Sequence, residues 1–186
     1  MVGAADRAKR LAGLDRERVT AAAVRLLDAE GPARFSMRRL AAELNVTAMS
    51  VYWYVDTKDE LLELALDAVF GELELPDPES EADWRDRLRG LATGYRAMLV
   101  RHPWVSALIG NPVDVGPCSA AFSECVRRVA ADTGIPPYGQ VGAVSAVFQF
   151  VYGAQFAGAE SGERDSEFAL DLLIAGIEAM VARSGR

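Results

Sequence analysis

The spacing of apolar residues between clusters of helix-breaking residues restricts the fold of this chain more than any other feature. Within residues 19–27, and again within 61–69, apolar side chains recur at intervals of three and four, which is the period of one buried face of an α-helix. No segment alternates apolar and polar residues as a half-buried strand does. The sequence therefore predicts an all-α fold. Breaker clusters separate the helical segments at 31–32, 76–78, 110–117, 134–137 and 159–165.

The helical segments form a short N-terminal group and a longer C-terminal group. We expect a three-helix domain over residues 1–58 and a second helical domain over 59–186. Charge follows the same division, because residues 1–58 contain ten Lys/Arg and seven Asp/Glu, a net of +3, whereas the remainder has a net of −10. A basic N-terminal part indicates that this part meets a polyanion. The predicted helices span 15–30, 36–43, 47–54, 57–73, 82–101, 103–109, 118–132, 138–159 and 166–183.

Composition excludes several classes of protein. Two cysteines and one histidine are too few for a disulfide framework or a zinc centre. The sequence has no Gly-rich phosphate loop, nucleophile elbow or metal-ligand spacing, so we expect no enzyme, metal or cofactor. Residues 133–159 are uncharged over a length that could span a bilayer. Their prolines, glutamines and glycines favour a buried helix instead. Residues 1–14 lack the apolar run of a signal peptide, and we expect a cytoplasmic protein with no membrane partner.

Residues 35–58 have the pattern of two short helices joined by a tight turn. Ser36 is a favourable N-cap for the first helix, which Leu40 and Ala41 would bury on one face. Asn45 tolerates the left-handed conformation that ends a helix within one residue, and Thr47 can cap the second helix. Such a helix-turn-helix presents its second helix to the major groove of DNA.

The second helix of this motif has an inward and an outward side. Spacing turns Val51 and Val55 inward. The aromatic run 52–54 cannot share one helix face, so at least one of its rings faces outward. The residues left outward at the N-terminal end, where base edges would be met, are Thr47, Ala48, Met49 and Tyr52.

The stretch Val51-Tyr52-Trp53-Tyr54-Val55, followed by Lys58 and Leu61-Leu62, resembles the DNA-binding domain of the TetR family of transcriptional repressors. The resemblance extends from about residue 14 to about residue 183. Four later segments match, in order, the regulatory domain of the tetracycline repressor. They are Trp84–Arg89, Tyr95–Leu99, Phe168–Leu173 and Gly176–Glu178. This resemblance implies a homodimer that binds an operator and a C-terminal domain for ligand binding and dimerisation.

The resemblance also implies roles for individual residues at the DNA. Arg38 would contact a base, and Tyr52 and Lys58 would contact phosphates. These roles agree with side-chain chemistry, because Arg binds guanine O6 and N7 in bidentate fashion while Tyr and Lys position the backbone. Ala48 and Met49 offer apolar contact alone, which suits a thymine methyl. The full predicted DNA-contacting set is Arg38, Thr47, Ala48, Met49, Tyr52, Trp53 and Lys58.

Aromatic and polar residues of the C-terminal part could line a ligand cavity. Plain core packing is the alternative for each of them. Gln149 and Gln155 lie in an otherwise apolar helix, where a buried amide would need partners. The positions of the tetracycline repressor's drug- and magnesium-contacting histidines hold Glu74 and Ile109 here, so a tetracycline–magnesium ligand is not expected. The predicted lining is Tyr95, Met98, Trp104, Phe122, Phe148, Gln149, Tyr152 and Phe156.

The roles of the histidine and the two cysteines stay open. His102 fits an internal cap, a pocket donor or a surface residue. Cys118 and Cys125, seven residues apart on one helix face, fit buried thiols or an oxidant sensor.

Helices 138–159 and 166–183 each have two apolar faces. One face of each can pack within the chain, and the second needs another partner. Pairing with the same helices of a second copy would make a four-helix dimer interface, which the resemblance also implies; an intramolecular core is the alternative. The predicted interface comprises Gly142, Ala146, Gly153, Ala157, Phe168, Leu172, Ala175 and Ala179. The opposite apolar faces of the two helices comprise Val141, Val144, Phe148, Tyr152, Gln155, Leu170, Leu173, Ile177 and Val181.

These observations predict a ligand-responsive transcriptional repressor that binds a palindromic operator as a homodimer. A DNA-independent helical scaffold and a small-molecule-binding protein are the alternatives. Both alternatives would lack the salt-sensitive DNA affinity that phosphate contacts produce.

Overall fold

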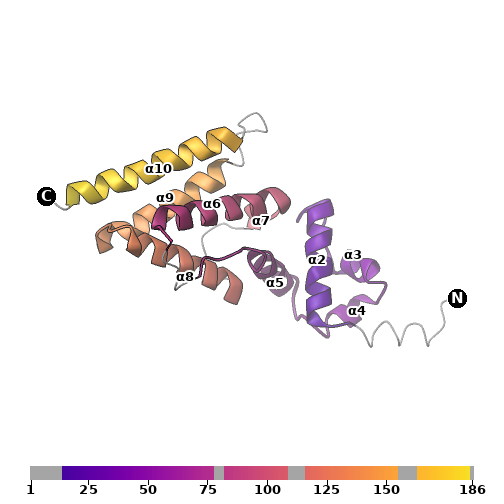
Figure 1. Ribbon diagram of the computed structural model, residues 1–186. Coiled ribbons are helices and arrows are strands. Elements are labelled where there is room, and N and C mark those ends of the chain that lie inside the picture. Colours follow the sequence, from indigo (N-terminus) through magenta and orange to yellow (C-terminus); the bar gives the residue numbers. More distant parts are fainter. Residues whose placement is uncertain (1–13, 78–81, 109–115, 155–162, 185–186) are drawn as a thin grey trace. The chain divides into compact units, whose positions relative to one another are not determined.

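A computed structural model describes residues 14–77, 82–108, 116–154 and 163–184 of the chain (Figure 1). Within those residues the chain forms helices and no strand, so the predicted all-α fold is confirmed. The helices are α2 (Arg16–Glu30), α3 (Met37–Glu43), α4 (Ala48–Val51), α5 (Lys58–Phe70), α6 (Trp84–Arg101), α7 (Val105–Leu108), α8 (Pro117–Asp132), α9 (Pro137–Ala154) and α10 (Glu163–Ser184).

The chain folds as two compact units. The N-terminal unit comprises Met1–Glu72 and Arg101–Ser119, and the C-terminal unit comprises Leu73–Val100 and Ala120–Arg186. This division differs from the predicted boundary after residue 58, because α5 packs along α2 and stays with the N-terminal helices. The functional division into a DNA-binding and a regulatory domain stays a prediction.

Helix α2 is the centre of the N-terminal unit. The Asp15 carboxylate caps it by accepting a 2.7 Å hydrogen bond from the Arg18 backbone N–H. Gly31 ends it at φ 75°, where its own N–H donates to the carbonyl of Leu27. The buried face of α2 meets α3 and α5, as the apolar spacing predicts. This core includes Val19, Ala22, Ala23, Leu26, Leu27, Leu40, Leu61, Ala65 and Val69.

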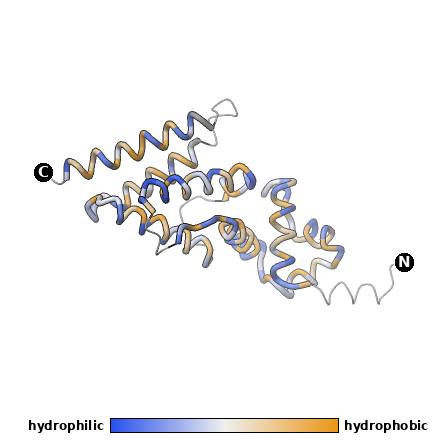
Figure 2. Tube along the Cα trace, viewed as in Figure 1, coloured by the Kyte–Doolittle hydropathy of each residue, from blue (hydrophilic) through white to orange (hydrophobic). Residues whose placement is uncertain are grey.

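The C-terminal unit contains α6 as far as Val100, most of α8, and the helices α9 and α10, which pack on each other. Apolar residues recur along the length of α9 and α10 (Figure 2). Its core includes Leu88, Leu91, Phe122, Val126, Val147, Val151, Leu170 and Ile174. None of the helices in the described residues is long and apolar enough to cross a membrane.

Candidate nucleic-acid interface and regulatory site

The turn between α3 and α4 is built by local hydrogen bonds that the sequence predicts. The Ser36 hydroxyl accepts from the Arg39 N–H at 3.3 Å and begins α3. Asn45 takes the left-handed conformation at φ 54°, and the next residue, Val46, donates its N–H to the carbonyl of Ala41. The chain thus reverses within four residues, which is the geometry of a helix-turn-helix.

Helix α4 is shorter than predicted. Thr47 caps it by accepting from the Ser50 N–H at 3.2 Å, but the helix ends at Val51 rather than at residue 54. Residues 52–54 continue as turns. Tyr54 donates its N–H to the carbonyl of Val51, three residues back, and such tighter bonds commonly close the last turn of a helix. The chain therefore leaves α4 early.

Most of the predicted DNA-contacting side chains lie on the surface. Met49 is 70% exposed and Trp53 83% exposed, although apolar groups of this size are usually buried. Val51 and Val55 are buried and anchor the segment from within, as predicted. Ala48 is half-buried. The exposed members of the predicted set are Arg38, Thr47, Met49, Tyr52, Trp53 and Lys58.

The two arginines at the start of α3 differ in their surroundings. Both side chains are exposed, and Arg39 forms an ion pair with Glu30 at the end of α2. Lys58 begins α5, and its ammonium lies 5.8 Å from the centroid of the Phe35 ring. The Lys58 charge thus lies at a helix N-terminus, which favours anions.

Comparison with known proteins identifies this arrangement. The family described as "Bacterial regulatory proteins, tetR family" matches residues 19–65, and the family "Tetracyclin repressor-like, C-terminal domain" matches residues 75–167. The chain belongs to the TetR family. Members of the TetR family are transcriptional regulators that bind DNA through a helix-turn-helix, and they are not enzymes.

Two relatives and one solved structure of the TetR family are close to this chain. An HTH-type transcriptional regulator of Saccharopolyspora erythraea is 42% identical over 141 residues, 76% of this chain and 59% of that protein. The HTH-type transcriptional repressor DrrR1 of Streptomyces coeruleorubidus is 36% identical over 159 residues, 82% of this chain and 59% of that protein. The chain therefore spans about three fifths of the length of both relatives.

The solved structure is apo ActR from Streptomyces coelicolor. It superposes with a TM-score of 0.78 and 25% sequence identity, covering 92% of this chain and 98% of ActR. ActR has also been solved in complex with actinorhodin. The fold of this TetR-family chain is thus one in which another member holds a small molecule.

Aromatic side chains from three helices meet in the C-terminal unit. The Tyr95 ring of α6 stacks on Phe122 of α8, with centroids 5.4 Å apart. Phe148 of α9 meets both rings edge-on, at 5.5 Å from Tyr95 and 5.4 Å from Phe122. Met98 is buried and Tyr152 is half-buried. We call Tyr95, Phe122, Phe148 and Tyr152 the aromatic cluster.

The aromatic cluster is closed. The cavity lined by Tyr95, Phe122 and Phe148 has a volume of about 10 Å³, which is close to the space that one water occupies. Burial, with a contribution from Tyr152, raises the pKa of Tyr95 to about 12. An organic ligand could enter only if side chains of the cluster moved aside.

Three predicted lining residues either lie away from the aromatic cluster or fall outside the described residues. Trp104 belongs to the N-terminal unit, where its indole N–H donates to Asp28 at 2.6 Å. Gln149 is exposed, so the argument from a buried amide does not hold for it. Phe156 and Gln155 lie outside the described residues. The spacing of residues along the sequence does not distinguish these residues from those of the aromatic cluster, because it does not show which helices pack together.

The predicted dimer-interface residues lie on the outer sides of α9 and α10. Phe168 is 66% exposed and Leu172 59% exposed. Ala157 lies outside the described residues. Tyr138 and Met180, which the sequence interpretation did not name, are exposed, and so is Val141, which it placed on the face opposite the predicted interface. Val147 and Val151 take the inward positions on α9 instead. The other exposed members of the predicted set are Gly142, Ala146, Gly153, Ala175 and Ala179.

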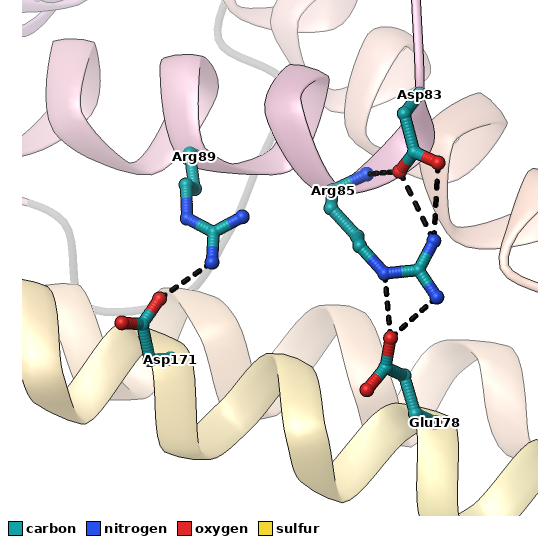
Figure 3. Close-up of polar contacts among 5 residues, drawn as sticks. All are labelled: Asp83, Arg85, Arg89, Asp171 and Glu178. Atoms are coloured by element: carbon teal, nitrogen blue, oxygen red, sulfur yellow. Dashed lines mark hydrogen bonds and ion pairs between the residues drawn. The ribbon is translucent and has the colours of Figure 1, made fainter.

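Two arginines of α6 hold α10, a feature that the sequence analysis did not find (Figure 3). Arg89 donates to Asp171 at 2.5 Å. Arg85 donates through Nε to Glu178 at 2.6 Å and also contacts Asp83 at 3.1 Å. The i,i+4 spacing of the arginines and the i,i+7 spacing of the acids are the signals that could have revealed it.

Both cysteines are half-buried thiols. Burial raises the pKa of Cys118, where Asp67 adds to the effect, and burial also raises the pKa of Cys125. A raised pKa lowers the thiolate fraction and hence the reactivity toward oxidants, so the structure favours the buried-thiol interpretation over a sensor.

Proposed function

We propose that this TetR-family protein is a ligand-responsive transcriptional repressor that binds a palindromic operator as a homodimer. The observation that carries the proposal is that Met49, Trp53 and the cations Arg38 and Lys58 of one helix-turn-helix are all exposed. Exposed apolar side chains suit base edges, and exposed cations suit phosphates. Such a repressor acts on chromosomal DNA, so we expect it in the cytoplasm.

Dimerisation is supported by the outer sides of α9 and α10. A single four-residue recognition helix makes few base contacts, whereas two copies related by a two-fold axis double them and read a palindrome. The exposed apolar side chains Tyr138, Val141, Phe168, Leu172 and Met180 form the kind of surface that a second copy would cover. Half-sites about one helical turn apart follow from this arrangement.

The proposed effector is an apolar, aromatic small molecule that enters the aromatic cluster. The cavity lining is apolar apart from the hydroxyl of Tyr95. Phe148 and Tyr152 are half-buried, and we expect these side chains to move aside. The complex of ActR with actinorhodin, in the same fold, supports this choice of ligand class. Ligand binding would favour a state with lower operator affinity, by a factor of about 5–150 in systems of this kind.

The test begins with duplexes selected from a random library by the full chain. We expect the selected sequence to be palindromic and its affinity to fall steeply with salt, since each phosphate contact released adds about one to the slope. A half-site duplex should bind far more weakly than the full site. Equal affinity for both, from a chain that is monomeric in light scattering, would contradict the proposal.

The effector is tested with a panel of polycyclic aromatic compounds. We expect a thermal shift and release from the selected duplex for at least one compound. Phe148→Ala together with Tyr152→Ala should abolish the ligand response and keep the operator affinity. Gln149→Ala, a change of an exposed neighbour on the same helix, should preserve both. A double variant that retains the full response would place the ligand elsewhere.

A further inference from the structure

The single histidine of the sequence is buried between two carboxylates in the N-terminal unit. His102 is 3% exposed and directly follows α6. Its Nδ1 lies 2.7 Å from an Asp28 oxygen, and its Nε2 lies 3.2 Å from a Glu72 oxygen. Asp28 belongs to the last turns of α2, and Glu72 follows the end of α5. One ring therefore joins the segment after α6 to α2 and to the end of α5.

Two further side chains complete this set of contacts. The indole N–H of Trp104 donates at 2.6 Å to the same Asp28 oxygen that faces His102. Arg101, the last residue of α6, donates at 2.6 Å to the Glu72 oxygen that faces His102. The charged groups around the ring are thus Asp28 from α2, Glu72 after α5 and Arg101 from α6. Burial acts to raise the pKa of Glu72, but hydrogen bonds from His102 and Arg101 hold that pKa below its ordinary value.

The geometry sets a condition on the protons of the ring. An ionised carboxylate can accept hydrogen bonds but cannot donate them. Both ring nitrogens of His102 face carboxylate oxygens, so both must carry a hydrogen for both bonds to form. A neutral imidazole has one N–H and would turn a lone pair toward one of the acids. The complete set of contacts therefore requires the imidazolium form.

We propose that protonated His102 is a positioning residue of the N-terminal unit, which fastens the segment after α6 to α2 and to the end of α5. Residues of α6 up to Val100 belong to the C-terminal unit. His102 thus lies where the chain enters the N-terminal unit. Loss of the ring proton would remove one of the two bonds, because a neutral imidazole has a single N–H to donate. The effect on operator affinity rests on the proposed function, whereas the effect on stability does not.

The experiment uses the full chain and its His102→Gln variant at about pH 6 and about pH 8, the range in which a histidine is the side chain that changes charge. Denaturant unfolding and affinity for a selected duplex are measured at both values. At the lower pH we expect His102→Gln to raise the unfolding equilibrium constant about tenfold to a hundredfold, the range for a lost hydrogen bond between charged groups. The wild-type chain should lose stability and affinity at the higher pH, and the variant should show neither change.

Matched variants separate positioning from general charge effects. Glu72→Gln and Asp28→Asn each remove one acceptor charge and should reduce the pH dependence. Glu63→Gln makes the same charge change on the exposed side of α5 and should leave the dependence intact. Trp104→Phe keeps an aromatic side chain at position 104 but removes the indole N–H that donates to Asp28. This variant should preserve the pH dependence.

A direct readout needs no variant. Because the chain has one histidine, the ¹⁵N spectrum of its imidazole reports His102 alone. We expect two protonated ring nitrogens at about pH 6. A neutral ring at that pH, or an unchanged pH dependence in His102→Gln, would overturn the proposal. If the wild-type chain bound no DNA, the proposed function would be wrong. The stability and spectroscopic measurements would still test the proposed role of His102.

Discussion

Arg38 and Lys58 are both exposed cations of the helix-turn-helix, but they occupy different places on its elements. Arg38 projects from the first turn of α3, next to an arginine that is held by Glu30. Lys58 opens α5, whose first-turn amides already favour an anion. A guanidinium can read a base edge in two bonds, whereas an ammonium at a helix N-terminus acts as a point charge on phosphate.

Replacing these two residues should therefore have different consequences. Arg38→Ala should cost about 1–3 kcal/mol of binding to the selected operator and relax the base preference at one position. Lys58→Ala should weaken all sequences alike and reduce the salt slope by about one. Anisotropy titrations on the operator and on single-base variants, at several salt concentrations, measure both effects. Identical behaviour of the two variants would show that the division into base and phosphate contacts is wrong.

Local residue roles were predictable to the extent that they depend on neighbours in the chain. The left-handed Asn45 and the cap of Thr47 depend on the next few residues, and the sequence predicts both. The surroundings of His102, Trp104 and Gln149 depend on which helices pack together. The partner of His102 and Trp104 is Asp28, more than seventy residues earlier in the chain. The spacing of apolar residues does not reveal a contact between residues so far apart.

At the scale of elements, the orientation of α10 is the feature that matters most for assembly. Its inner face buries Leu170 and Ile174. Arg85 and Arg89 of α6 hold the acids Glu178 and Asp171 along one side (Figure 3). Together these contacts decide which stripe of α10 is left outward. The sequence predicts two apolar faces but not the ion pairs that orient them.

Removal of one of these ion pairs should loosen α10 locally. We expect Arg89→Ala to lower the protection of α10 amides against hydrogen exchange, by no more than about 1 kcal/mol because the pair is partly exposed. The effect should shrink with added salt. Arg127→Ala removes an exposed pair within α8 and should leave α10 unchanged. Equal protection in Arg89→Ala and in the wild-type chain would mean that apolar contacts alone orient the helix.

At the scale of the whole molecule, the exposed apolar side chains on the outer sides of α9 and α10 are the feature that bears on assembly. The predicted pairing of these helices with their copies would cover Phe168 and Leu172. Such a surface also makes stability depend on protein concentration, since association stabilises the folded state by mass action.

A charge placed on this surface should separate the copies. We expect Phe168→Glu combined with Leu172→Glu to yield a folded monomer by light scattering and to weaken binding to the full operator at least tenfold, the loss of about 1.4 kcal/mol. Val100→Glu adds a charge at an exposed apolar position of α6 and should keep the dimer. Circular dichroism confirms that the double variant is folded. A double variant that stayed dimeric would place the interface on another surface.

The exposed indole of Trp53 makes this chain its own optical reporter. The sequence has three tryptophans. Trp104 is buried against a carboxylate, Trp84 is half-buried beneath the guanidinium of Arg85, and Trp53 alone among them faces solvent at 83% exposure. Emission at the red edge of the spectrum therefore comes mainly from the turn after α4. A duplex that covers that turn would quench or shift this emission, so unlabelled protein can be followed on and off DNA in real time.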